Sequence, residues 1–120
     1  SYVAIDTLHV NGRMTQGENI ADLGGLTMAF YAYKKSLNGK ASLQMAGLSG
    51  EQRFFIAWTQ GWKQVCRDEE LKRLLTIDYH SPPYFRSFAP LSNMKEFYDA
   101  WGVKEGDKMY MKDSERAVIW

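Results

Sequence analysis

The sequence has a single cysteine, almost no net charge and no long apolar run, and each shortage excludes a class of protein. Cys66 alone cannot form an internal disulfide or a thiolate cluster for a metal, so a buried, inert thiol is expected there. The 15 basic and 14 acidic side chains leave a formal net charge of +1, which gives no electrostatic case for binding nucleic acid or an anionic membrane surface. No apolar run approaches the roughly 20 residues that a membrane helix needs.

Several common sequence signals are also missing. Residues 1–6 have neither a basic start nor a long apolar stretch, so they do not form a signal peptide. We therefore read the chain as one cut out of something longer, with any targeting segment outside it. The sequence has no internal repeat, no CxxC pair, no glycine-rich phosphate loop and no Ser-His-Asp order.

What is present is ample material for a core and a helical pattern. Hydrophobic residues make up 45% of the chain, so disorder is not expected. Apolar spacing predicts a mainly α fold in a single domain, residues 1–120. The first helix should begin near Thr15 or Gln16 and stop at Asn38-Gly39. Further helices are predicted over residues 51–65, 68–75 and 93–101.

The sequence also predicts which face of one helix is apolar and where the chain is not helical. The predicted second helix has an apolar stripe formed by Phe54, Phe55, Trp58, Trp62 and Val65. After the third helix, the prolines of the 81–83 segment forbid helix continuation and predict an extended or turning backbone. Residues 2–10 alternate in a way that allows extended structure, and the tail from residue 102 is predicted to be irregular.

The start of the long helix carries the first candidate site. Glu18 and Asp22 are four residues apart, so their carboxylates share one face. One interpretation is two solvated acids in a favourable first turn. The other is a metal ligand, Glu18, with Asp22 behind it as the acceptor that orients a ligating histidine. Gly24-Gly25 favours the second interpretation, because glycine inside a helix is usually tolerated where another backbone approaches closely.

The second candidate site surrounds the proline segment. Asp78 could accept a hydrogen bond from His80 and so fix its tautomer. His80 could then donate to a developing oxyanion, and Arg86 could hold a substrate carbonyl or carboxylate through its fork of donors. The alternative is a loop histidine with a local hydrogen bond and a surface arginine. His9 has no acid or cysteine at metal-ligand spacing, which indicates a structural or surface residue.

These two motifs resemble the neprilysin and endothelin-converting-enzyme family of zinc metallopeptidases. The resemblance begins at residues 9–26 with the string GENIADLGG, and it continues through residues 54–62 and 78–86. It closes at Val118-Ile119-Trp120. It implies a zincin-type (gluzincin) catalytic domain of which this chain is the C-terminal part, acting on internal bonds of peptides, and an extracytoplasmic location.

The resemblance also implies a role for each candidate residue. Glu18 would be the third protein ligand of a catalytic zinc, and Asp22 would be hydrogen-bonded to one of the zinc histidines. His80 would stabilise the oxyanion, with Asp78 orienting it. The two substrate-binding residues would be Arg86, which grips the substrate backbone, and Trp62, near the pocket for the residue after the scissile bond.

The sequence departs from the family pattern in one decisive respect. The HExxH motif that supplies two zinc histidines is absent, because neither His9 nor His80 is followed by Glu. Glu18 gives one of three expected protein ligands, so we expect the isolated chain to be inactive and not to bind zinc at the full site. A non-catalytic helical interaction module and a chain that completes an active site in trans remain alternatives. Apolar faces left uncovered should favour self-association.

Overall fold

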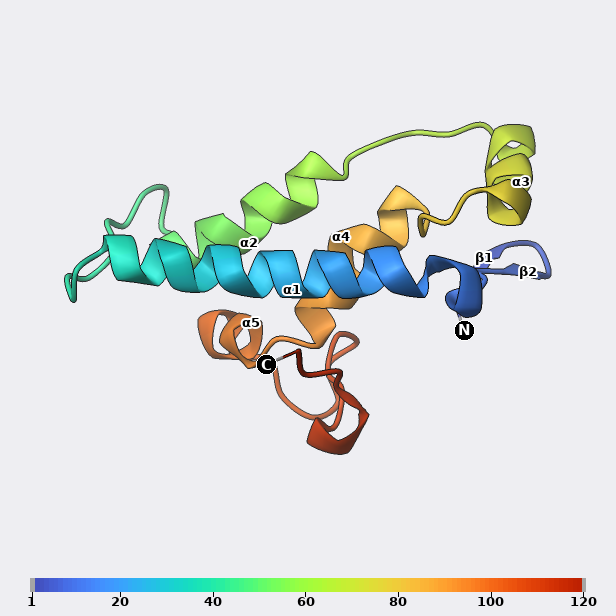
Figure 1. Cartoon of the computed structure of the whole chain (residues 1–120). Helices are drawn as coiled ribbons and strands as arrows, with labels where there is room; N and C mark the ends of the chain where they lie inside the picture. Colours follow the sequence, from blue (N-terminus) through green and yellow to red (C-terminus); the bar gives the residue numbers. More distant parts are fainter. Residues whose placement is uncertain (1, 120) are drawn as a thin grey trace.

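The first helix, α1, spans Gly12–Ser36 and runs along most of the length of the molecule (Figure 1). The computed structural model describes residues 2–119; Ser1 and Trp120, which closes the stretch of family resemblance, lie outside the described residues. α1 begins three or four residues earlier than predicted because the Asn11 side chain caps it, accepting from the Met14 amide. Its predicted end is confirmed, since Asn38 and Gly39 both take positive φ angles.

A short hairpin precedes α1, and two helices follow it. Strands β1 (Val3–Ile5) and β2 (Leu8–His9) pair antiparallel. Helix α2 spans Gly50–Gly61 and starts with a capping box made by Ser49 and Gln52. Helix α3 spans Asp68–Ile77 and lies beside the hairpin at one end of the molecule (Figure 1).

The predicted second helix extended to Val65, and this prediction is wrong. α2 ends at Gly61, after which residues 63–67 run extended to α3 (Figure 1). Val65 is 99% exposed, so it is not part of the apolar stripe. Gly61, a residue type that weakens helices, precedes Trp62, and the Trp62 ring packs on Arg86. Cys66 lies in the same extended segment and is half-buried, so the expected fully buried thiol is also wrong.

Helix α4, Pro83–Ser92, was not predicted from the sequence. The prolines do end the preceding helix, as expected, but Pro83 occupies the first turn of α4, where its missing amide hydrogen is not needed. Pro90 lies in the last turn. Helix α5 follows closely as Lys95–Trp101 and stops at Gly102, which has φ 66°.

The core lies where α1, α2, α4 and α5 meet. α4 packs on α1, α2 and α5, and the Phe30 and Phe55 rings stack at 5.2 Å. The buried apolar cluster comprises Leu23, Leu26, Phe30, Phe55, Leu91, Met94, Phe97 and Tyr98. The mainly α class is therefore confirmed.

The C-terminal tail is mostly irregular, as predicted, with one 3-10 turn, η1, at Asp113–Glu115. Tyr98 fixes the tail to the core: its hydroxyl donates to the Ser92 carbonyl at 2.6 Å and accepts from the Met111 amide at 2.7 Å. Asn93 accepts from the Ala117 amide at 2.7 Å. The tail is thus held beside α4 and α5. Within residues 2–119, no helix is long and apolar enough to cross a membrane.

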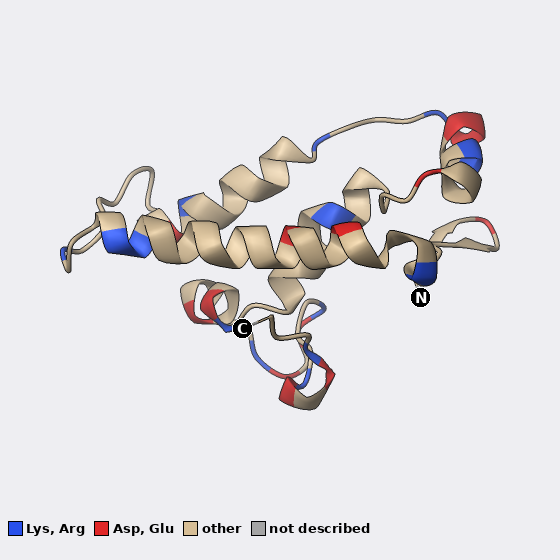
Figure 2. Cartoon of the chain, viewed as in Figure 1, with Lys and Arg blue, Asp and Glu red and all other residues tan. Residues whose placement is uncertain are grey.

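Part of the α1 surface remains uncovered. Figure 2 shows charged residues toward both ends of α1 and an uncharged middle, and the sequence has no charged residue from 23 to 33. Ile20, Met28 and Tyr31 are exposed along this helix. Gly25 is exposed as well, and a β-carbon added there would meet nothing within 4 Å. Space for a close neighbour therefore exists at one of the two glycines that the sequence singled out.

Candidate functional site

The candidate residues converge where the first half of α1 meets the segment between α3 and α4. α1 contributes Glu18 and Asp22, the connecting segment contributes Asp78 and His80, and α4 contributes Arg86. The two halves of the site lie more than 60 residues apart in the sequence, as the Asp22–Arg86 separation of 64 shows. The fold therefore brings both sequence motifs to one place.

His80 stands between two carboxylates. Its Nδ1 lies 2.7 Å from Asp78 Oδ1, and its Nε2 lies 3.5 Å from Glu18 Oε2. The His80 backbone amide also donates to Asp78 Oδ1 at 2.9 Å. The hydrogen bond from this backbone amide and the contact with the ring hold the pKa of the Asp78 carboxyl below its usual value. Asp78 thus fixes the ring orientation, while Nε2 is directed toward Glu18.

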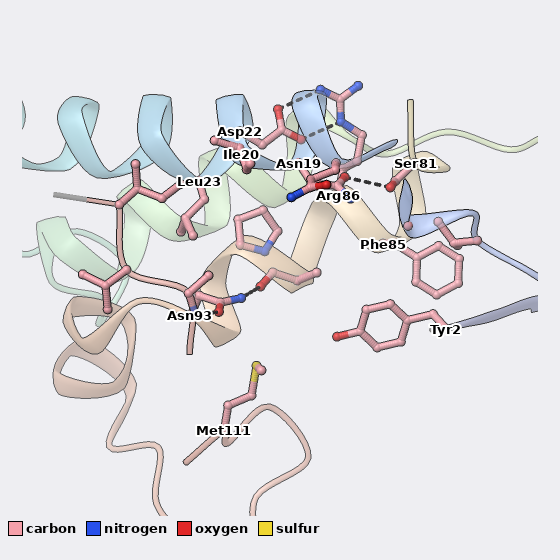
Figure 3. A pocket seen from close by; sticks show the side chains of 18 residues that line it. Tyr2, Asn19, Ile20, Asp22, Leu23, Ser81, Phe85, Arg86, Asn93 and Met111 are labelled. Atoms are coloured by element: carbon pink, nitrogen blue, oxygen red, sulfur yellow. Dashed lines mark hydrogen bonds and ion pairs between the residues drawn. The ribbon is translucent and has the colours of Figure 1, made fainter. Parts of the chain in front are cut away.

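Asp22 and Arg86 form a two-pronged ion pair. Arg86 Nε donates to Asp22 Oδ2 at 2.6 Å, and the terminal nitrogen Nη2 donates to Oδ1 at 2.7 Å. Figure 3 shows the carboxylate facing the guanidinium fork. The side chains are 10% and 13% exposed, so solvent screens the pair little. The sequence suggested separate partners for these residues, and the pairing between them was not predicted.

Trp58 and Trp62, at the C-terminal end of α2, also contact Arg86. The Arg86 guanidinium carbon lies 4.0 Å from the Trp62 ring centroid, within cation–π distance. Trp58 Nε1 donates to the Arg86 backbone carbonyl at 3.1 Å, and the two indoles meet edge-on at 5.5 Å. Trp58 was expected to be a core residue, and its partly buried ring does pack on the core. The sequence did not predict the hydrogen bond from Trp58 to the Arg86 carbonyl.

Asn19 and Ser81 also belong to this site, and the sequence analysis did not identify them. The buried Ser81 hydroxyl donates to Asn19 Oδ1 at 2.7 Å (Figure 3), and Asn19 Nδ2 donates to Thr15 Oγ1 at 3.1 Å. Each residue directly follows a candidate residue, Glu18 or His80. That adjacency was the one available signal.

A cavity of about 610 Å³ opens beside these polar groups. Asp22, Arg86, Asn19 and Ser81 line one end of it (Figure 3). Mostly apolar side chains of the N-terminal segment, α1, α4 and the C-terminal tail line the rest, including Tyr2, Leu23, Phe85, Pro90, Met111 and Ile119. The site therefore borders a largely apolar hollow.

The residues present do not make a complete zinc site. In the part of the chain that the structure describes, no three His, Cys, Asp or Glu side chains group so as to hold a metal. Glu18 is 40% exposed, as is His80, and its carboxylate has the donor chemistry of a zinc ligand. His9 lies in β2 of the hairpin. The chain thus offers one fitting ligand and not a full set.

The chain is similar in sequence to one family of peptidases. The model of peptidase family M13 matches residues 2–117. The chain is 42% identical over 112 residues to an endothelin-converting enzyme homolog of Locusta migratoria, covering 91% of this chain and 15% of that protein. It is 43% identical over 114 residues to endothelin-converting enzyme 1 of Homo sapiens, covering 92% of this chain and 14% of that protein.

A solved structure shows the same fold. The zinc metalloprotease ZMP1 of Mycobacterium tuberculosis, in complex with an inhibitor, is 44% identical and superposes with a TM-score of 0.93. The match covers 95% of this chain and 17% of that one, so the chain spans about a sixth of the proteins it matches. The predicted fold, part of a zincin-type peptidase domain, and the predicted family resemblance are both confirmed. The chain belongs to peptidase family M13, with the neprilysins and endothelin-converting enzymes.

Proposed function

We propose that this chain is the C-terminal part of the catalytic domain of a zinc metalloendopeptidase, and that it supplies half of an active site. The observation that carries the proposal is the convergence of Glu18, His80 and Arg86. Glu18 Oε2 lies 3.5 Å from His80 Nε2, and Arg86 is paired with Asp22 one helical turn beyond Glu18. A carboxylate, an imidazole and a guanidinium held together in this way suit the hydrolysis of a peptide bond.

Within the complete enzyme, Glu18 would be a zinc ligand and His80 would stabilise the oxyanion. The His80 ring is held from behind by Asp78 at 2.7 Å, which leaves Nε2 toward the open side of the site. With Nδ1 donating to Asp78, Nε2 would donate when both ring nitrogens carry a proton. A donor held in place in this way stabilises developing negative charge because it needs no reorientation during the reaction. The half-exposed Glu18 carboxylate is accessible from the same side.

Arg86, Asp22 and Trp62 would form the substrate-binding part. Asp22 engages the Nε donor and one Nη2 donor of Arg86, so the Nη1 donors and the second Nη2 donor would take a carbonyl or carboxylate. Trp62 covers one face of the guanidinium at 4.0 Å. Both Asp22 oxygens accept from Arg86. Each carboxylate oxygen keeps a further lone pair, so Asp22 could also accept from a zinc histidine, as the family resemblance implies.

The chain by itself would be inactive because it lacks two of the three ligands. When bound, zinc would supply the activation of water for hydrolysis. The missing histidines would come from polypeptide that carries HExxH, and the substrates would be peptides. The extracytoplasmic location stays a prediction that follows from the family resemblance.

A peptidase assay tests this proposal. The chain is incubated with zinc and a quenched-fluorescence peptide, alone and mixed with the part of a family M13 peptidase that carries HExxH. We expect cleavage on mixing and none from the chain alone. Cleavage by the isolated chain would overturn the half-site proposal. If neither the isolated chain nor the mixture cleaves the peptide, a non-catalytic interaction module would be favoured. Glu18→Gln should abolish cleavage in the mixture.

The uncovered middle of α1 supports a second proposal, self-association of the isolated chain. Met28 and Tyr31 are exposed within the uncharged segment 23–33, and Ile20 is exposed shortly before it; exposed apolar patches favour association. Light scattering should detect dimers or larger species at high concentration, and Met28→Lys should reduce them. A strict monomer at high concentration would contradict this proposal.

A further inference from the structure

A chain of hydrogen bonds joins the His80 segment to α1 at the level of the candidate site. The Ser81 hydroxyl donates to Asn19 Oδ1 at 2.7 Å, Asn19 Nδ2 donates to Thr15 Oγ1 at 3.1 Å, and Thr15 Oγ1 donates to the Asn11 carbonyl at 3.1 Å. Ser81 is 5% exposed and Thr15 is 2% exposed. Figure 3 shows Ser81 directed at Asn19 from the facing segment.

The direction of every bond in this chain is fixed by chemistry. The Asn11 carbonyl can accept but not donate, so the Thr15 hydroxyl proton is committed to it. Thr15 Oγ1 must then accept from Asn19, which places the amide nitrogen of Asn19 toward Thr15 and its oxygen toward Ser81. Ser81 must therefore be the donor. A side chain without a donor at position 81 would remove this protein donor to Asn19 Oδ1 and break the link to α1.

Both ends of the tie between Asn19 and Ser81 are adjacent to candidate site residues. Asn19 follows Glu18 on α1, and Ser81 follows His80. The Glu18–His80 contact is 3.5 Å long with both side chains 40% exposed, and contacts of that exposure contribute little on their own. The Ser81–Asn19 bond is shorter, at 2.7 Å, and its Ser81 side is buried although Asn19 is exposed, so it is the better candidate for holding the two elements in register.

We propose that Asn19 and Ser81 are positioning residues whose hydrogen bond sets the Glu18 carboxylate against the His80 imidazole. Their importance for catalysis rests on the function proposed above. The geometric claim does not, because it concerns the distance between two side chains of this chain in the absence of zinc and substrate. An experiment that detects this contact directly can therefore succeed or fail independently of any peptidase activity.

Nitrogen-15 spectra of the histidine rings provide such a readout. The chain has two histidines, so His9 in the hairpin serves as an internal reference for His80. The spectra of all variants are recorded at the same pH, about two units above the ordinary histidine pKa. Glu18→Gln is made in the wild-type chain and again in Ser81→Ala.

In the wild-type background, Glu18→Gln should shift the His80 Nε2 resonance because the carboxylate is a direct neighbour. In the Ser81→Ala background, the shift caused by Glu18→Gln should fall to the scatter seen for His9. Ser81→Thr retains a hydroxyl and should restore the shift. An equal shift in both backgrounds would overturn the proposal, since the contact would then form without the tie.

Two further variants separate positioning from general stability. Ser92→Ala removes a hydroxyl that is buried to the same degree but donates to the Phe88 carbonyl within α4. It should leave the response of His80 to Glu18→Gln intact, and a loss of response in this variant would contradict the proposal. Should Ser81→Ala fail to fold, Asn19→Ala breaks the same bond from the exposed side, and the same two outcomes apply to it.

Discussion

Replacing Asp22 by alanine should lower the free energy of unfolding by about 3 kcal/mol, because it leaves the Arg86 guanidinium buried without its carboxylate. The pair is held by two bonds of 2.6 and 2.7 Å, and the side chains are 10% and 13% exposed. The ring of Trp62 remains 4.0 Å from the guanidinium carbon and offsets part of the loss. The expected cost therefore lies toward the lower end of the roughly 3–5 kcal/mol for broken buried pairs.

The chain contains a matched control for this argument. Arg73 donates to both Glu70 oxygens at 2.8 and 2.7 Å, which is nearly the geometry of the Asp22–Arg86 pair. The Arg73 and Glu70 side chains are 56% and 45% exposed, so water screens the interaction. Glu70→Ala should therefore have a much smaller effect than Asp22→Ala, although both pairs have two hydrogen bonds of similar length.

Urea unfolding followed by circular dichroism measures both variants, with the slope of the transition checked against the wild type. A second variant, Asp22→Asn, keeps the shape and one acceptor and should lose less than Asp22→Ala. Equal losses for Asp22→Ala and Glu70→Ala would refute the reasoning, because burial would then not decide the strength of these pairs.

Three further predictions concern other contacts. Gly50→Ala should destabilise the chain by about 1–3 kcal/mol, since the new β-carbon would lie 2.6 Å from Ser42 Cβ; Gly25→Ala, which meets open space, should be neutral or stabilising by up to about 1 kcal/mol, and the reverse order in thermal melts would contradict this. A hydrogen bond from Lys34 lowers the pKa of Glu51 to about 2. The contribution of the Glu51 carboxylate to the free energy of unfolding is therefore fully present above pH 4.5 and is lost as pH falls through about 2. The stability difference between wild type and Glu51→Gln, from urea titrations over that range, should shrink toward low pH, and a constant difference would contradict the assignment. Trp58→Phe removes one donor to a backbone carbonyl and should cost about 1 kcal/mol in urea unfolding, whereas unchanged stability would mean that this bond contributes nothing.

Much of the fold was predictable from local chemistry. The end of α1 followed from Asn38-Gly39, and the residues take the left-handed conformations that this signal predicts. The start of α2 likewise lies within one residue of the prediction. α4 was missed because proline was treated as a helix breaker, although Pro83 stands in the first turn, where proline is favoured.

The site was only partly predictable, because its contacts join residues that are distant in the sequence. The strings around Glu18 and His80 marked both halves, and Asp78 lies within two residues of its partner. Nothing in the spacing pairs Asp22 with Arg86 across 64 positions. The Asn19–Ser81 bond, across 62 positions, was equally hidden. Such pairs depend on how α4 packs on α1, and α4 itself was not foreseen.

Zinc affinity tests the central claim most directly, namely that Glu18 completes a metal centre whose histidines come from HExxH-bearing polypeptide. The chain is mixed with that part of a family M13 peptidase, and zinc binding is measured by competition with a chelator. We predict that Glu18→Gln weakens zinc binding by the mixture at least about tenfold, since even residues that merely orient ligands have effects of that size, while Glu51→Gln leaves it unchanged. Equal zinc affinity for the wild type and Glu18→Gln would contradict the account.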